Sequence, residues 1–272
     1  MVDGAGDYAY DGSGNGNDGT LTNMTSADWL TGQTGCPQLV EGYNRPMLFD
    51  GSNDVVENTS VSFPTGTQSR TIAGWVWLDD ATSSGGVFGY GTGPSTPYHV
   101  FEFYNYGTSI RLHYATYNSG GSTALSSKTW YHLAGTYDGT TAKVYINGAL
   151  NHTDTVTLAT VSSFARFGCH NYSASPGGFV KGNINEVVFY NTALSLAQVQ
   201  ALAATDPNGG PLPPDAMSLS NSSNVVGYWR NDGNVTWTDR SGNGNTGTVS
   251  GSPDTLLFKQ GINGSASTST GR

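Results

Sequence analysis

The sequence predicts an all-β protein built as a sandwich of two antiparallel sheets. Three observations indicate this class: short runs of alternating apolar and polar residues, turn residues at close spacing, and a scarcity of long charged side chains. The 272-residue chain contains 38 glycines, and only 11% of its residues are charged. Glycine suits tight turns, and aromatic and β-branched residues suit strands, so we expect many short strands joined by turns.

The clearest local signal lies in residues 129–148. Two alternating runs flank Asp138-Gly139, and Asn147-Gly148 follows the second run. Both dipeptides favour tight turns with positive φ, because Gly has no Cβ and Asn or Asp tolerates that region. We therefore expect antiparallel strands on either side of Asp138-Gly139 and a second turn at Asn147-Gly148.

Further strands are expected along most of the chain. Arg70–Leu78 alternates with both faces largely apolar, which is typical of a central strand in a sandwich. Shorter runs predict strands at residues 19–21, 47–49, 55–56, 86–90, 98–104, 109–114, 151–158, 164–169 and 179–190. One short helix is expected at residues 195–203, because Ser195 and Gln198 fit a capping box.

An internal repeat divides the end of the chain from its body. Residues 239–249 match residues 11–21 at eight of eleven positions, and a strand pattern at 225–230 precedes only the second copy. Residues 206–223 begin with a Pro- and Gly-rich tract, which predicts a linker. We expect a sandwich at 1–205 and a partial second repeat at 224–272 that adds a strand to its own or a neighbouring sandwich.

Charge and apolar content exclude some classes of partner. The net charge is −9 with 11 Lys and Arg and no basic patch, so we expect no nucleic-acid partner. No apolar run is long enough to insert in a membrane, and the N-terminus lacks the pattern of a signal peptide. Cys36 and Cys169 predict either one long-range disulfide or two small buried thiols, and the sequence leaves both open.

Several pieces resemble laminin-G-like domains of the concanavalin A-like lectin/glucanase superfamily. They are the stretch 129–148 and residues 48–54, 71–76, 182–190 and 193–195, in the family's order. Residues 226–229 and 241–245 resemble the family's N-terminal strand and loop. The resemblance covers residues 8–204 and implies a concanavalin A-like jelly roll with a C-terminal partial repeat. The fold hosts lectins, adhesion modules, hydrolases and spacers, so it implies no single activity.

Catalysis is not expected. Glycoside hydrolysis needs two carboxyl groups about 5–5.5 Å or about 6.5–9.5 Å apart. Glucanases of this fold carry a Glu-x-Asp-x-x-Glu-type cluster on one strand, and no such cluster occurs here. Glu102 has no acidic neighbour two or four positions away, and Glu186 corresponds to a structural Glu of the family. We therefore predict that the protein is not an enzyme, with a glucan hydrolase as the weakest alternative.

Calcium is the one cofactor that the sequence suggests. Asp50, Asn53 and Asp54 form one oxygen-rich turn and Asp138 lies in another, and such oxygens suit a hard cation. The resemblance agrees, since relatives often bind calcium at a sandwich edge. The competing interpretation is that Asp and Asn occupy these positions for turn geometry alone.

Tyrosines near predicted loops and sheet ends are the candidate ligand contacts. Tyr90, Tyr98, Tyr106 and Tyr117 are expected to stack on sugar rings. Two functions remain open: a non-catalytic structural or adhesion module of a larger surface assembly such as a phage head or tail, and a calcium-assisted lectin. The expected partners are other subunits of a homo-oligomer or virion and a cell-surface glycan, and the expected location is extracellular or on a virion surface.

Overall fold

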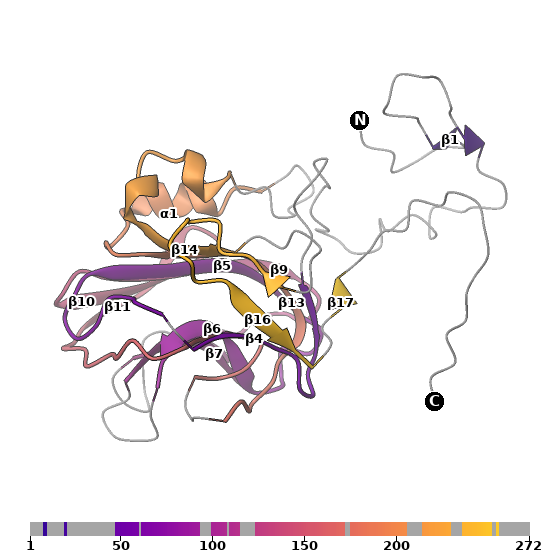
Figure 1. Ribbon diagram of the computed structural model, residues 1–272, viewed down its shortest axis with the longest axis horizontal. Helices are drawn as coiled ribbons and strands as arrows, with labels where there is room; N and C mark the ends of the chain where they lie inside the picture. The colour runs from indigo at the N-terminus through magenta and orange to yellow at the C-terminus, as the bar shows by residue number, and fades with distance from the viewer. Residues whose placement is uncertain are drawn as a thin grey trace.

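Two antiparallel sheets, packed face to face, make up the described part of the protein. The computed structural model describes residues 8–9, 19–20, 47–59, 61–92, 99–107, 109–114, 123–171, 175–205, 214–229, 236–251 and 254–255. Figure 1 shows the two sheets as layers, with α1 (Leu196–Leu202) on the outer side of the layer that contains β5. The predicted all-β sandwich is therefore confirmed.

The first sheet has Arg70–Leu78 near its centre. Its strand order is β11-β10-β9-β5-β13-β3-β17, and β14 also pairs with β13. The bounds are Ala149–Thr155 for β11, Thr141–Ile146 for β10, Trp130–Tyr137 for β9, Arg70–Leu78 for β5, Lys181–Tyr190 for β13, Met47–Asp50 for β3, Asp254–Thr255 for β17 and Val225–Trp229 for β14. Every residue of β5 is buried, as expected for a strand with apolar residues on both faces.

The second sheet has the order β15-β16-β4-β12-β6-β7-β8. Its bounds are Thr236–Trp237 for β15, Gly247–Ser250 for β16, Val55–Asn58 for β4, Ala165–Phe167 for β12, Gly85–Gly91 for β6, Val100–Tyr106 for β7 and Ser109–His113 for β8. A separate two-stranded ribbon consists of β1 (Tyr8–Ala9) and β2 (Gly19–Thr20).

The turns predicted in residues 129–148 are present. Gly139 and Gly148 adopt φ of 108° and 74°, and Asn147 adopts φ of 50°. The Asn147 side chain also supports the hairpin, because its Oδ1 accepts a hydrogen bond from the His132 backbone N–H at 2.8 Å. The local pattern fixed both turns because their backbone angles depend on these residue types.

The core lies between the inner faces of the two sheets, the faces that pack on each other. Aliphatic and aromatic side chains fill it, with Phe167 and Phe189 packed against Trp229 at ring-centroid distances of 4.9 and 5.1 Å. A second apolar cluster covers the outer face of the first sheet, where Val199 and Leu202 of α1 pack over the strands. The predicted capping box of Ser195 and Gln198 is present at the start of α1.

The segment after α1 differs from the expected linker. In the described residues of 206–223, two short 3-10 helices are present: η2 (Ala216–Ser218) and η3 (Ser222–Asn224). Ala216 is buried and Met217 packs on the outer cluster, so this part of the chain is held by apolar contacts. Beyond it, β14 pairs with β13 and β16 pairs with β4 of the same chain. The C-terminal segment thus contributes strands to both sheets of one sandwich.

Candidate functional site

The outer face of β7 and β8 carries polar and aromatic side chains, several of them at least partly exposed. In β7, Phe101 and Phe103 point into the core, so alternation places the residues between them on the outer face. On β8, Ile110 and Leu112 are inward in the same way. We call the outward set the β7–β8 face; it consists of Glu102, Tyr104, Tyr106, Arg111 and His113.

Strand register brings these five side chains together. Glu102 lies opposite His113, and Tyr104 lies opposite Arg111. The His113 ring stacks on Tyr104, with centroids 4.9 Å apart and an angle of 7° between the planes. The Arg111 guanidinium carbon lies 5.2 Å from the centre of the Tyr106 ring, within range of a cation–π contact. Tyr106 is 60% exposed, which leaves much of its side chain available to a ligand.

A buried carboxylate lies beneath this face. Glu102 is 1% exposed, and its Oε2 accepts hydrogen bonds from the backbone N and the Nδ2 of Asn171, at 2.7 and 3.0 Å. Its Oε1 lies 3.8 Å from His113 Nδ1. The carboxylate therefore lies within ion-pair distance of His113, without a hydrogen bond between them. Burial raises the pKa of Tyr104, and the negative charge of Glu102 raises it further, so Tyr104 presents a neutral hydroxyl at ordinary pH.

Glycine in the neighbouring strand leaves the room that Glu102 occupies. Gly89 of β6 lies opposite Glu102, and a Cβ on Gly89 would overlap the Glu102 backbone. Nearer the start of β6, a Cβ on Gly86 would overlap the backbone of His170, close to Asn171. The glycines thus allow the segment that carries Asn171 to approach the sheet closely enough to bind the carboxylate.

The spacing of carboxylates does not suit glycoside hydrolysis. The next acidic residue on the same rung of the sheet is Glu57 of β4, which forms an ion pair with the buried Arg166. Glu57 and Glu102 are separated by three strand spacings, or about 14 Å at about 4.8 Å each. That separation exceeds the about 9.5 Å that an inverting hydrolase uses. Glu57 and Glu102 are therefore too far apart to act together as the carboxyl pair of a glycosidase.

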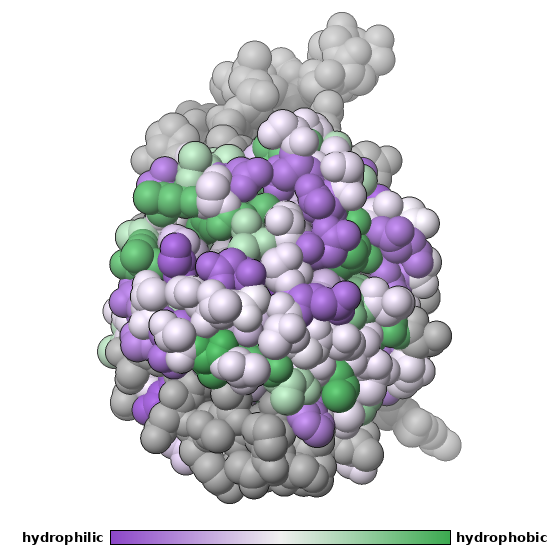
Figure 2. Space-filling view, turned by 90° about the vertical axis from the view of Figure 1, so that its left-hand side faces the viewer, coloured by the Kyte–Doolittle hydropathy of each residue, from purple (hydrophilic) through white to green (hydrophobic). Residues whose placement is uncertain are grey.

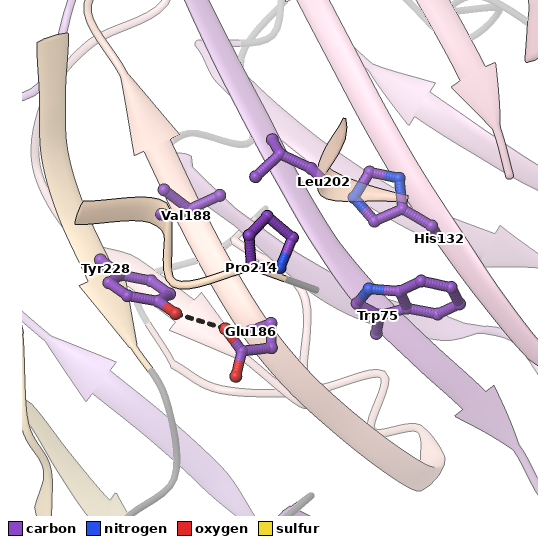
Figure 3. Close-up of a pocket in the computed structure, with 8 residues that line it drawn as sticks. Trp75, His132, Glu186, Val188, Leu202, Pro214 and Tyr228 are labelled. Atoms are coloured by element: carbon purple, nitrogen blue, oxygen red, sulfur yellow. Dashed lines mark hydrogen bonds between the residues drawn. The ribbon is translucent and has the colours of Figure 1, made fainter. Parts of the chain in front are cut away.

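A second candidate, on the outer face of the first sheet, is too small for a sugar. Figure 3 shows Trp75, His132, Glu186 and Tyr228 around a pocket, with the Tyr228 hydroxyl donating to Glu186. The free space is about 10 Å³, which is room for about one water molecule. Trp75 packs edge-on against His132 at 5.3 Å, and burial lowers the pKa of His132 to about 3.

The hydrogen bond between Tyr228 and Glu186 links two strands of the sheet next to this pocket. Glu186 adopts φ of 52° at an irregularity of β13, where the pairing with β5 shifts between Asn185 and Val188. The irregular backbone turns its carboxylate toward Tyr228 of β14. Glu186 therefore ties the C-terminal strand to the sheet, in agreement with the structural role that the sequence implied.

The structure places the four predicted tyrosines differently. Tyr90 is 1% exposed and packs against Phe63 and Phe189, so the prediction that it contacts a ligand is wrong. Its hydroxyl donates to the Pro64 carbonyl oxygen at 2.7 Å, which satisfies the one polar atom of a core side chain. Tyr106 lies on the β7–β8 face, whereas Tyr98 and Tyr117 lie outside the described residues.

The carboxylates of Asp50 and Asp54, two of the predicted calcium ligands, accept backbone hydrogen bonds within a turn. Asp50 Oδ1 accepts from the backbone N–H groups of Ser52 and Asn53, and Asp54 Oδ2 accepts from the Asp50 N–H at 2.7 Å. Asn53 is exposed, whereas Asp54 is buried. Within the described residues, no group of three or more His, Cys, Asp or Glu side chains is placed to hold a metal. Calcium binding at this turn stays a prediction.

Asp138 occupies the other end of the first sheet. Its Oδ1 accepts from the backbone N–H groups of Thr140 and Thr141, at 2.9 and 2.8 Å. Those two bonds are the main reason why the Asp138 pKa is lowered. Asp138 comes directly after Tyr137, which pairs with Arg70 at the start of β5. Asp50 pairs with Lys181, and the next residue, Gly182, pairs with Leu78 at the end of β5. The two turns therefore lie at opposite ends of β5 and do not form one site.

Sequence reasoning assigned neither Arg111 nor His113 of the β7–β8 face to a ligand site. Their signal is the strict alternation of β7 and β8, which places them on one face if the two runs form a hairpin. No local signal leads to Asn171, because its contact with Glu102 spans 69 residues.

The surface in Figure 2 offers no broad apolar area that would make another candidate site. Figure 2 shows one end of the sandwich, where apolar, weakly polar and hydrophilic residues are interspersed without a broad apolar patch. Cys169 is buried, and burial raises its pKa to about 12; Cys36 lies outside the described residues. Among the described helices, none has the length and apolar character needed to span a membrane.

Comparisons with known proteins identify the fold. A Bacteroides ovatus protein with a suggested carbohydrate-binding role superimposes with a TM-score of 0.55 at 19% identity, over 79% of this chain and 61% of its own. This chain therefore spans about three fifths of the length of that protein. A heptameric SAP-like pentraxin of Limulus polyphemus superimposes with a TM-score of 0.48 at 13% identity, over 70% of this chain and 93% of its own.

Family membership comes from the sequence itself. A search of curated proteins returned no match to this chain. The Laminin_G_3 family model, described as the concanavalin A-like lectin/glucanases superfamily, matches residues 50–200. This match covers more than half of the 272 residues and includes the central strands of both sheets. The chain therefore belongs to the Laminin_G_3 family of the concanavalin A-like lectin/glucanases superfamily.

Proposed function

We propose that this protein is a non-catalytic carbohydrate-binding module and that the β7–β8 face contacts the glycan. The observation that carries the proposal is the pairing of Tyr106, an exposed aromatic ring, with Arg111 and with the Tyr104–His113 stack on one sheet face. Sugar recognition by proteins combines flat aromatic surfaces with a few fixed polar groups, and this face supplies both. The suggested role of the Bacteroides ovatus protein is of the same kind.

Each side chain has a distinct contribution in this proposal. Tyr106 offers an apolar surface to the C–H face of a pyranose ring, and Arg111 offers donors to hydroxyl or carboxylate oxygens. His113 offers a ring nitrogen at the edge of the stack, where its ring packs flat on Tyr104. Because these groups lie on paired strands rather than on long loops, they are fixed before the ligand arrives.

A glycan array followed by calorimetry with the strongest ligand tests the proposal. Tyr106→Ala and Arg111→Ala should each weaken binding by about tenfold, which corresponds to about 1.4 kcal/mol. Leu150→Ala is the matched control, because Leu150 is 53% exposed on β11 of the other sheet. Absence of binding to every glycan, or an equal loss in the Leu150→Ala variant, would contradict the proposal.

The same array separates this function from the two other predictions. Binding that is lost with a chelator and restored by calcium would support the calcium-assisted lectin and would direct attention to Asp50, Asn53 and Asp54. Binding unchanged by the chelator would contradict the calcium-assisted lectin, and the Tyr106→Ala and Arg111→Ala variants would then test the β7–β8 face. The predicted role in a virion or other surface assembly, with an extracellular or virion-surface location, stays a prediction.

A further inference from the structure

Arg111 has different partners from the other arginines that the structure describes. The guanidinium of Arg70 donates to three backbone carbonyl groups. Arg166 and Arg240 each form an ion pair with a carboxylate. Arg111 is partly exposed, and its Nε donates to the Ser109 hydroxyl at 3.4 Å. Within the described part of the chain, no carboxylate or carbonyl group pairs with its guanidinium, so its two Nη groups are available to a ligand.

The positive charge of Arg111 lies away from the acidic residue of the same face. Its guanidinium carbon is 5.2 Å from the centre of the Tyr106 ring. Tyr106 is four residues beyond Glu102 in β7, a separation of about 13 Å at about 3.3 Å per residue. Tyr104 lies between them on the same face, where it stacks on His113. The guanidinium and the exposed Tyr106 ring therefore form a positively charged end of the β7–β8 face, separate from the Glu102 carboxylate.

The acidic composition of the chain makes an unpaired cation significant for an acidic ligand. The net charge is −9, and 11 Lys and Arg are spread over 272 residues. Lys128 and Lys181, for example, share the carboxylate of Asp79. An anionic group that approaches such a protein needs a local cation without a carboxylate partner, and Arg111 is one. Its planar guanidinium presents N–H groups in pairs, which match the two oxygens of a carboxylate.

We propose that the β7–β8 face selects glycans that contain hexuronic acid, an assignment that rests on the proposed glycan-binding function of the same face. The sugar ring packs its C–H groups on the exposed part of Tyr106. The carboxylate of a hexuronic acid projects from the rim of the sugar ring, where it meets the Arg111 guanidinium over the same tyrosine. Arg111 then holds the carboxylate through two N–H groups.

A carboxylate and a hydroxyl should differ measurably at this site. Charge-assisted hydrogen bonds are about twice as strong as bonds between neutral groups. We therefore expect a hexuronic acid glycan to bind about tenfold more tightly than its counterpart in which each carboxyl group is reduced to a hydroxymethyl group. Because Arg111 is partly exposed, added salt should weaken binding of the acidic glycan more than binding of the neutral one.

Calorimetry with matched pairs of glycans tests the assignment. The probes are oligosaccharides of galacturonate, of mannuronate and of glucuronate, each beside its carboxyl-reduced counterpart. Arg111→Gln keeps hydrogen-bond donors but removes the charge, so the acidic-to-neutral ratio of affinities should fall to about one. Arg111→Lys keeps the charge without the paired N–H groups, so part of the ratio should remain. The control, Lys143→Gln, removes the same charge from β10 of the other sheet, and the ratio should stay at its wild-type value.

Three results would overturn the assignment. The first is a wild-type ratio of about one for every pair of glycans, or no binding of any hexuronate. The second is a ratio that Arg111→Gln leaves unchanged, or that Lys143→Gln lowers equally. The third is a sulfated galactan that binds as tightly as the hexuronates, because the site then takes any anion rather than a carboxylate. Circular dichroism confirms that each variant is folded before it is titrated.

The same titrations separate this assignment from the function on which it rests. If neutral glycans bind, Tyr106→Ala weakens them and the acidic-to-neutral ratio is about one, the hexuronate assignment fails and the glycan-binding face stands. If neither the hexuronates nor any glycan of the array binds, both fail.

Discussion

Glu102 and Asn171 are 69 residues apart in the chain, and the buried Glu102 carboxylate accepts two hydrogen bonds from Asn171. One bond comes from the backbone N–H and the other from the side-chain amide. Together they compensate for placing an acidic group beneath the sheet surface, where an unpaired carboxylate would be costly. A contact between distant segments therefore holds this carboxylate beneath the proposed binding face.

Asn171→Ala should lower the free energy of unfolding by about 1.5–3 kcal/mol, because it removes one hydrogen bond to a buried charge. Urea denaturation measures this change. Asn151→Ala is the control, since Asn151 is exposed on β11 and its loss should cost less than about 0.5 kcal/mol. Equal stability losses in the two variants would mean that the Glu102–Asn171 contact is not stabilising.

The sequence predicted those parts of the fold that local chemistry determines. Asp138-Gly139 and Asn147-Gly148 specify their turns because few other residues adopt the required backbone angles. Arg70–Leu78 was predicted with its observed bounds because nine consecutive residues alternate with apolar side chains on both faces. The capping box identified the start of α1 because both partners lie within four residues.

Features that depend on distant contacts were not predictable in this way. Tyr90 ends the strand predicted at residues 86–90, yet β6 continues to Gly91 between β12 and β7, and packing against distant segments buries the ring. Residues 214–223 follow a proline-rich tract, and their three-residue 3-10 helices are too short to show periodicity. The Glu102–Asn171 contact has no sequence signal, because it depends on how β12 pairs with β6.

Gly89→Ala should destabilise the protein strongly, by about 1–3 kcal/mol or more, because the new Cβ would overlap the backbone of Glu102. Gly135→Ala is a matched comparison within the other sheet. There the new Cβ would lie 2.6 Å from Leu112 Cδ2, the end of a flexible side chain that can move. We therefore expect a smaller loss for Gly135→Ala. Thermal or urea unfolding measures the stability of both variants. A larger loss of stability for Gly135→Ala than for Gly89→Ala would contradict the proposed role of Gly89.

Trp229→Ala should lower the free energy of unfolding by about 3–5 kcal/mol, since the indole is fully buried among Phe63, Phe167 and Phe189. Its Nε1 also donates to the Asn245 carbonyl oxygen at 2.8 Å. Trp229→Phe keeps much of the volume and should cost less. If Trp229→Ala left stability unchanged, the C-terminal segment would not be part of the sandwich core, and removal of residues 214–272 would be tolerated as well.

His132 should make the protein less stable as the pH falls from about 6.5 toward about 3. Burial lowers its pKa to about 3 in the folded protein, whereas an exposed histidine titrates near about 6.5. Between these values the unfolded chain binds a proton that the folded protein does not, so the free energy of unfolding rises with pH there. One such proton corresponds to a slope of about 1.4 kcal/mol per pH unit, and the stabilisation is complete above about pH 6.5.

Urea denaturation of the wild type and of His132→Gln, at several pH values between 4.5 and 7.5, isolates this contribution. The wild-type curve should be steeper than that of the variant by about one proton, because glutamine does not titrate. Asp80 and Asp138 also have lowered pKa values, but they change the stability of the wild type and the variant equally, and at more acidic pH. Parallel curves for the two proteins would show that His132 does not take up a proton on unfolding. The pocket that His132 shares with Trp75 and Glu186 would then accommodate the protonated ring, contrary to what the burial of His132 implies.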